Sequence, residues 1–247
     1  FGFARHVVVQ ENQTTPVTID LSGAYNLHLT GNIIYPSGFR PDTSPIPPGI
    51  FTSLNIVGAG FVSGIGESLQ NPPLDTFDIL LPDFSAAGLD PAVDSLQISA
   101  NAIYTKDTRG TPFNLDDWRQ TLSWSGSRLV GQILSGQPLT IQFPEPAIAE
   151  SPVDGAIVPR NQLKLKWRAP RNGDPTSYFL QVIDPQTNQI LWNVSSSNIG
   201  YTEITLPVFP DGYDPLPAGK TLKWAVYASF PNGSTSDYGM LFTPAQP

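Results

Sequence analysis

The feature that most constrains the fold is a two-residue alternation of apolar and polar side chains that recurs along the chain. Val17, Ile19 and Leu21 alternate with polar residues, and the run 25–33 repeats the pattern after a Ser-Gly turn. Successive side chains of a β-strand point to opposite faces of a sheet, so this period indicates strands with one buried face. No window shows the 3.6-residue period of an amphipathic helix. The pattern therefore predicts an all-β protein.

Segments rich in glycine and proline separate the predicted strands, as in turn-rich β-proteins. The Gly-rich stretch 58–66 lacks both the spacing and the following helix of a nucleotide-binding loop, and we interpret it as a hairpin tip or a close-packing bend. One short helix is predicted at 114–119, where an asparagine precedes acidic residues. The remaining predicted strands are 50–57, 76–81, 95–105, 120–124, 128–134, 138–143, 163–167, 178–183, 189–194, 201–206, 222–228 and 238–243.

The segment 144–151, PEPAIAES, has no strand pattern and is predicted to be a linker. After it the alternation restarts, with about seven short strands in about 100 residues, the number typical of an immunoglobulin-like sandwich. The sequence therefore predicts two tandem β-sandwich domains, at about 1–147 and 148–247.

The second predicted domain contains the run LPAGKTLKWAVYA at 216–228 and the alternating segment LKLKW at 163–167. With these residues, the stretch 151–243 resembles the fibronectin type III family. The first run is similar to the family's passage from the E–F corner into strand F, and LKLKW resembles strand B with Trp167 as its inward residue. Leu222 stands where the family usually has a corner tyrosine, which removes one hydroxyl-to-backbone hydrogen bond. The resemblance implies an immunoglobulin-like sandwich with Trp167 and Trp224 in one core, together with Leu216 beneath the E–F corner and the inward-facing Val226 and Ala228. The first domain resembles no family.

The charge balance excludes several classes of partner. The formal net charge is −8, the pI is about 4.6 and the basic residues form no run, so nucleic acid and anionic membrane surfaces are disfavoured as partners. Cysteine is absent, which rules out disulfides, Cys-ligated zinc and Cys nucleophiles. No apolar run reaches the ~18 residues of a membrane-spanning helix. The low charge and the many polar uncharged residues favour a secreted or cell-surface location.

The sequence offers little for catalysis. Its two histidines, His6 and His28, both lie in predicted strands, and His28 is out of phase with its apolar neighbours, so we expect it to face solvent. No nucleophile elbow of the type Gly-x-Ser-x-Gly occurs. Most carboxylates fall at strand ends and turns, where aspartate is common for backbone capping. The predicted protein is therefore not an enzyme and has no cofactor.

We also predict no metal centre. The residues that would ligate Ca²⁺ if a site existed are Asp107, Asp116 and Asp117, which crowd one loop with Asn114. The loop lacks the spacing of an EF-hand, and ordinary turn and helix-cap roles are the favoured interpretation.

The first ten residues, FGFARHVVVQ, read as a strand followed by a turn-like break. Two interpretations compete. In one, this strand closes an edge of its own domain. In the other, it is donated from the free chain end to the open edge of a neighbouring copy, where main-chain hydrogen bonds give affinity and side chains fill pockets. Val7, Val8 and Val9 place apolar groups on both faces, which favours donation, and such head-to-tail contacts generate filaments.

The predicted function is that of a non-enzymatic extracellular structural or adhesive protein, whose partner is a protein, including further copies of itself as a surface filament or matrix subunit. The rival hypothesis is a carbohydrate-binding accessory module of an exported hydrolase. A third hypothesis, the hydrolase itself, would require an active site in the first domain. Exposed aromatic rings suit sugar stacking. Trp192 is one candidate, on a predicted edge strand, and the others are Trp118, Trp124, Tyr201, Tyr213 and Tyr238. Evenly spaced rows of aromatic residues are absent from the sequence.

Overall fold

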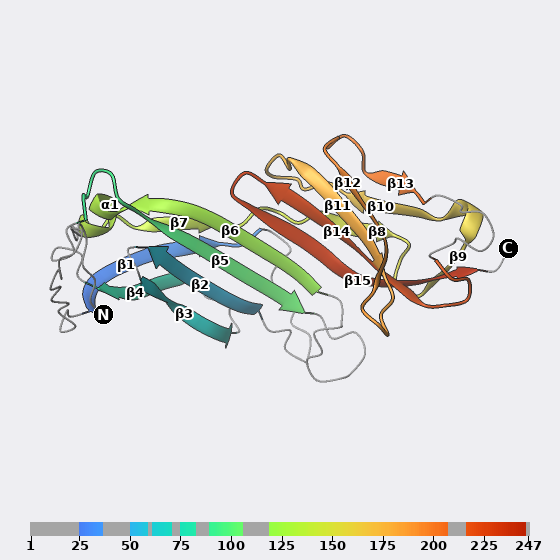
Figure 1. Cartoon of the computed structure of the whole chain (residues 1–247), viewed down its shortest axis with the longest axis horizontal. Coiled ribbons are helices and arrows are strands. Elements are labelled where there is room, and N and C mark those ends of the chain that lie inside the picture. Colours follow the sequence, from blue (N-terminus) through green and yellow to red (C-terminus); the bar gives the residue numbers. More distant parts are fainter. Residues whose placement is uncertain are drawn as a thin grey trace, which may run out of the picture.

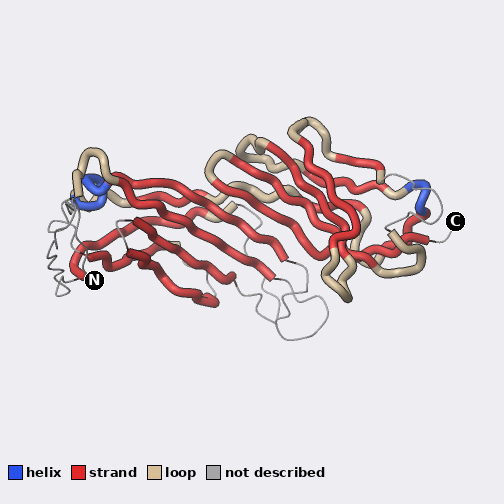
Figure 2. Tube along the Cα trace, in the orientation of Figure 1, coloured by secondary structure: helices blue, strands red, loops and turns tan. Residues whose placement is uncertain are grey.

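The computed structural model shows an elongated molecule built almost entirely from strands, with two packed regions end to end (Figure 1). Figure 2 shows how little of the described chain is helical. The predicted all-β sandwich class is confirmed.

The structure describes residues 25–36, 50–58, 61–70, 75–82, 89–105, 119–206 and 216–245. The elements are β1 (Tyr25–Ile34), β2 (Ile50–Gly58), β3 (Phe61–Gln70), β4 (Thr76–Pro82), β5 (Ser95–Thr105), β6 (Arg119–Leu129), α1 (Val130–Leu134), β7 (Leu139–Gln142), β8 (Ile148–Ser151), β9 (Ala156–Pro159), the 3₁₀ turn η2 (Arg160–Gln162), β10 (Lys164–Arg168), β11 (Ser177–Ile183), β12 (Ile190–Ser196), β13 (Glu203–Thr205), β14 (Leu222–Phe230) and β15 (Gly233–Ala245).

The N-terminal half contains the first hydrophobic core. A three-stranded sheet in the order β4-β1-β7 packs on β5 and β6, which belong to a larger sheet. The two-residue period sends Leu29 and Ile33 of β1 and Leu96 and Ile98 of β5 into the same buried cluster. Strand β1 is the centre of the smaller sheet, because it pairs antiparallel with β4 and parallel with β7.

The C-terminal half has a separate core between two further layers. The sheet β13-β10-β8 faces the strands β12, β11, β14 and β15. Trp167 is 2% exposed and Trp224 is fully buried, and both belong to one cluster, as the sequence predicts. The indole nitrogen of Trp224 donates a hydrogen bond to the carbonyl oxygen of Pro152 at 3.2 Å, so this ring is also fixed by a polar contact.

One sheet runs through both halves. Its strand order is β12-β11-β14-β15-β6-β5-β2-β3, with β9 paired to the far end of β15. Strand β15 makes this possible, because it pairs with β14 along one side and with β6 along the other. The register of the second pairing runs from Gly233 opposite Trp124 to Tyr238 opposite Arg119. The two cores are thus separate clusters joined by a continuous hydrogen-bonded sheet.

Small hydroxyl side chains line this junction. Thr121 Oγ1 lies 2.5 Å from Ser236 Oγ, and Ser123 Oγ lies 2.8 Å from Ser234 Oγ. Ser123 Oγ also accepts a hydrogen bond from the Ser234 backbone N–H at 3.0 Å. Such cross-strand pairs add to the main-chain bonds and fix the register of the two strands.

Two segments differ from the prediction. Residues 128–134 were expected to form a strand, but β6 ends at Leu129 and α1 follows. The chain turns there because the Val130 N–H donates to the Asp94 carbonyl oxygen at 2.9 Å, and burial of Val130 and Ile133, three residues apart, favours a helical turn. The predicted linker 144–151 was expected to have no strand, yet β8 pairs antiparallel with β10.

Other sequence predictions have mixed outcomes. The Gly-rich stretch 58–66, expected to be a hairpin tip or a close-packing bend, does join two antiparallel strands, with Gly58 of β2 opposite Phe61 of β3. Residues 61–66, however, lie within β3 itself, which was not predicted as a strand. The strand expected around Val17 and most of the helix expected at 114–119 lie outside the described residues. None of the helical segments that the structure describes has the length and apolarity that crossing a membrane requires.

We expect Gly233→Ala to weaken the junction between the halves. A Cβ atom at this position would lie 2.0 Å from the Ser123 carbonyl oxygen, so β15 and β6 would have to move apart. The free energy of unfolding in urea should fall by about 3 kcal/mol. Gly200→Ala is the control, because its nearest neighbour is the flexible Asn198 side chain at 3.3 Å. Equal stability of the two variants would contradict this role of Gly233.

Truncation of the central tryptophan tests the C-terminal core. Trp224→Ala should lower the free energy of unfolding by about 3–5 kcal/mol, because it opens a cavity in a fully buried cluster. Trp192→Ala, on the outer strand β12, removes the same ring from a half-buried position and should cost less. Urea denaturation followed by far-UV circular dichroism measures both, and a larger loss for Trp192→Ala would disprove the assignment.

Candidate functional site

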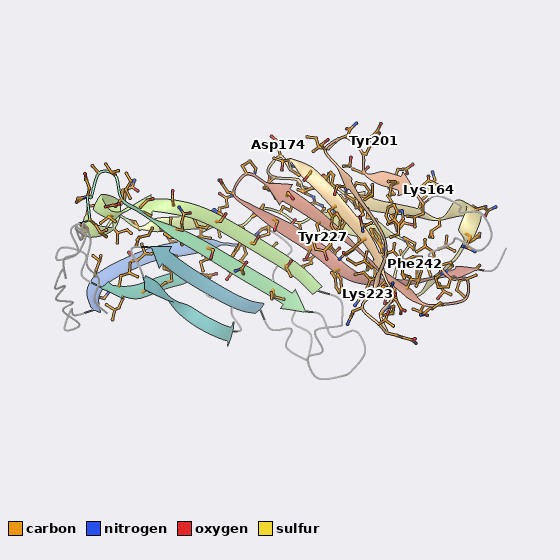
Figure 3. All side chains as sticks on the ribbon, in the orientation of Figure 1. Lys164, Asp174, Tyr201, Lys223, Tyr227 and Phe242 are labelled. Carbon is orange, nitrogen blue, oxygen red and sulfur yellow. The ribbon has the colours of Figure 1, made fainter. Side chains whose placement is uncertain are left out.

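A cleft of about 670 Å³ lies where the two halves meet. Its walls come from the ends of β1 and β7, from β6, from the loop after β10 and from the β14–β15 turn. Figure 3 labels Asp174 of this loop at the end of the C-terminal half that faces the N-terminal half. Cavities of this size at the boundary between packed units are the usual location of small-molecule sites.

Three half-buried aromatic rings line the cleft. Tyr35 stacks on the buried Phe143 ring, with centroids 5.7 Å apart and planes inclined by 29°. The Trp124 indole lies over Gly126, where a Cβ atom would be 2.6 Å from the ring. Phe230, from the C-terminal half, is the third ring. Each ring packs against a core, so each is held in place with little freedom to turn.

The polar part of the lining is neutral or acidic. Thr140 and Gln142 are the exposed residues of β7, whose alternation buries Leu139 and Ile141 on the other face. Across the cleft stand side chains from the C-terminal half, all exposed: Asn172, Asp174 and Asn232. Among the residues that the structure places in this lining, none is a lysine or an arginine.

A buried carboxylate fastens one wall of the cleft. Glu145 is 7% exposed, and its Oε2 accepts hydrogen bonds from the backbone N–H groups of Arg171 at 3.0 Å and Asn172 at 3.1 Å. A carboxylate from the segment between the halves therefore holds a loop of the C-terminal half. The β14–β15 turn is fixed as well, because the Ser125 N–H of β6 donates to the Asn232 carbonyl oxygen at 2.9 Å. These contacts preorganise the cleft.

A second, smaller opening of about 250 Å³ lies in the C-terminal half between β12 and β13. Each of these is the outer strand of its sheet among the described strands. The lining is mainly apolar and includes Trp167, Leu180 and Val194, with Ile204 on the β13 side. We call this opening the edge slot. It offers apolar contacts beside strand edges that no other described strand covers on one side, an arrangement suited to an added strand.

Ionisable groups away from these two sites have structural roles. Lys220 Nζ donates to Asp184 Oδ2 at 2.6 Å, and with the Gln186 N–H it holds the pKa of the Asp184 carboxyl below its ordinary value. This pair ties the turn after β11 to the segment before β14. On the face of β14 opposite the Trp224 side chain, Nζ of the buried Lys223 lies 4.4 Å from the centroid of the Tyr238 ring. Lys223 is labelled in Figure 3, and Tyr238 belongs to a small buried cluster with Ile183 and Ala225.

The sequence-predicted histidine is exposed, as expected. His28 Nδ1 lies 2.7 Å from Asp78 Oδ1, and both side chains are 56% exposed. Because both side chains are largely exposed, the pair is a surface contact. Among the described residues, no three acidic or histidine side chains gather as a metal site would require.

Several predicted site residues lie outside the described part of the chain: Val7, Val8, Val9, His6, Asp107, Asp116 and Asp117. Their roles stay predictions. Of the aromatic candidates for sugar stacking, Trp118 and Tyr213 lie outside the described residues, and Tyr238 is buried. Trp124 is half-buried in the lining of the cleft, and Trp192 is half-buried against the C-terminal core. Tyr201 is 62% exposed at the rim of the edge slot (Figure 3).

Comparison with known proteins found no matching family model and no similar curated protein. The candidate sites therefore rest on geometry. The sequence singles out Trp124 as an aromatic candidate, but it did not reveal the cleft, because the rest of the lining comes from four distant stretches, 34–36, 140–145, 172–174 and 230–232. The available signal was the cluster of Phe, Pro and Asn at 230–232, which marks an aromatic residue at a hairpin turn.

Removing the Glu145 carboxylate should loosen the cleft wall. In Glu145→Ala, the N–H groups of Arg171 and Asn172 lose their acceptor, so their hydrogen exchange should accelerate by roughly tenfold or more. Glu145→Gln keeps a neutral acceptor oxygen and should show a smaller acceleration. Amide exchange followed by mass spectrometry of peptides covering 169–175 measures this, and unchanged exchange in Glu145→Ala would rule out the proposed tie.

Proposed function

We propose that this chain is a non-enzymatic structural or adhesive protein that is secreted or lies at the cell surface, and that its copies associate through their sheets. The observation that carries the proposal is the single sheet that extends through both halves and makes the molecule one elongated body. A continuous hydrogen-bonded sheet transmits load along its length without a flexible linker between two units.

The outer strands of this sheet supply the means of association. Among the described strands, β3 pairs only with β2 and β12 pairs only with β11. An outer strand presents a row of main-chain donors and acceptors that can pair with another chain. The edge slot lies beside β12, so a strand added there would gain apolar contacts as well as main-chain hydrogen bonds.

The proposed donor is the segment with Val7, Val8 and Val9 from a second copy. Three consecutive valines put apolar groups on both faces of a strand. A strand added at the edge slot has one face toward Val194 and Ile204 of the lining, which suits aliphatic side chains. Contacts of one copy's donor with the next copy's slot are head-to-tail, and they propagate into filaments unless a ring closes.

A fibronectin type III-like C-terminal half is part of the proposal. A three-stranded sheet facing four strands is an arrangement of this kind of sandwich. The burial of Leu216 and Ala228 in the same cluster as Trp167 and Trp224 also supports it, since the family resemblance implies these positions in the core. Domains of this architecture occur widely in cell-surface proteins.

Deletion of residues 1–10 tests the assembly. The full chain should grow in mass with concentration by light scattering and form fibres under the electron microscope. The truncated chain should keep its circular dichroism spectrum, stay monomeric and bind the synthetic peptide FGFARHVVVQ. A full chain that is monomeric at all concentrations, or a truncated chain that unfolds, would show the proposal to be wrong.

A substitution in the acceptor gives an independent check. Val194→Asp places a charge in the edge slot and should abolish assembly while leaving the fold intact, because Val194 is only partly buried. Val93→Asp is the matched control at a position that is 73% exposed and outside the slot. Assembly that persists in Val194→Asp would locate the contact elsewhere.

A further inference from the structure

We propose that the cleft between the two halves binds a neutral oligosaccharide segment. The inference is independent of assembly, because the residues of the cleft and of the edge slot do not overlap. It rests on three properties of the described lining: its size and fixed shape, its aromatic rings, and its uncharged hydrogen-bonding groups.

The size and stiffness of the cleft suit a ligand of a few rings. A volume of about 670 Å³ falls in the range of roughly 300–1,000 Å³ that small-molecule sites occupy. Two parts of the lining are tied by hydrogen bonds, the loop after β10 through Glu145 and the β14–β15 turn through Ser125 with Asn232. A preformed cleft loses little conformational freedom when a ligand enters, which favours binding of a weakly held ligand such as a saccharide.

The rings provide apolar surfaces of the right kind. Tyr35, Trp124 and Phe230 are half-buried, so part of each ring remains accessible. Each ring packs against a fixed neighbour. Tyr35 stacks on Phe143, Trp124 lies over Gly126, and Phe230 packs against the C-terminal core. The C–H faces of a pyranose ring are apolar and flat, and they stack on rigid aromatic surfaces of this type.

The polar groups match hydroxyls better than charges. Gln142, Asn172 and Asn232 each present a carboxamide, which both donates and accepts hydrogen bonds. Vicinal hydroxyls on a sugar also donate and accept, so one carboxamide can bond to two of them. Thr140 adds a hydroxyl and Asp174 a carboxylate acceptor, and both are exposed beside the rings.

The charge of the lining selects against anionic ligands. The described lining has two carboxylates, Glu145 and Asp174, and no basic side chain. Sulfated, phosphorylated or uronate-rich polymers would approach this acidic surface of a chain with net charge −8 without a cation to pair with. The cleft therefore selects an uncharged polysaccharide. A plain packing gap would show no preference between neutral and anionic polymers.

The experiment is affinity electrophoresis of the full chain in native gels. The gels contain one soluble neutral polymer each: hydroxyethyl cellulose, xyloglucan, glucomannan or mixed-linkage β-glucan. A polygalacturonate gel is the anionic comparison. We expect retardation by at least one neutral polymer and none by polygalacturonate. Stronger retardation by polygalacturonate, or no retardation by any neutral polymer, would overturn the proposal.

Matched variants place the binding in the cleft. Trp124→Ala should weaken retention roughly tenfold through loss of stacking, and Gln142→Ala should weaken it roughly threefold to tenfold through loss of hydrogen bonds. Gln142 is exposed, so its variant keeps the fold even if loss of Trp124 disturbs the N-terminal core. Gln97→Ala, an exposed glutamine of β5, is the control and should bind normally. Full retention by Gln142→Ala and Trp124→Ala would exclude the cleft as the site.

Discussion

The backbone pairing of β15 with β6 is the interaction on which the rest of the structure depends. It joins two separately packed cores by main-chain hydrogen bonds in a single register, from Gly233 opposite Trp124 to Tyr238 opposite Arg119. Main-chain bonds have fixed direction and spacing, so the two halves cannot rotate about each other as units joined only by a linker do. Gly233 is needed there because β6 approaches so closely that a side chain at this position would strike the Ser123 carbonyl.

The cleft is a consequence of that pairing. Because β15 and β6 meet at their ends, the β14–β15 turn lies against β6 and brings Phe230 and Asn232 toward Trp124. The segment between the cores then passes close to the loop after β10, where the Glu145 carboxylate finds two backbone N–H groups that would otherwise lack acceptors. A buried carboxylate without such donors would be costly, so the loop and the carboxylate stabilise each other.

Local periodicity predicted most strands, because alternation is a property of each segment alone. It failed at the run RLVGQIL, which was predicted to be a strand because of its residue types. Val130 and Ile133 of this run lie three residues apart, a spacing that fits the helical turn observed there. It also failed at β8, where pairing with β10 makes a strand of a segment without alternation. Burial of Trp167 and Trp224 followed from family resemblance. The shared sheet and the cleft were not predictable, since they depend on contacts between residues more than 100 positions apart, such as Ser123 with Ser234.

The two proposed binding modes reinforce each other if both hold. The edge slot lies between β12 and β13, whereas the cleft opens at the junction of the halves, so a copy engaged in a filament keeps its cleft available. A filament would then present one saccharide site per subunit at regular intervals. A polysaccharide repeats its own unit along its length, so several weak sites on one rigid array bind it together with an avidity far above that of one cleft. An adhesive role therefore requires only modest affinity in each cleft, provided that the sheet keeps the clefts in a fixed orientation.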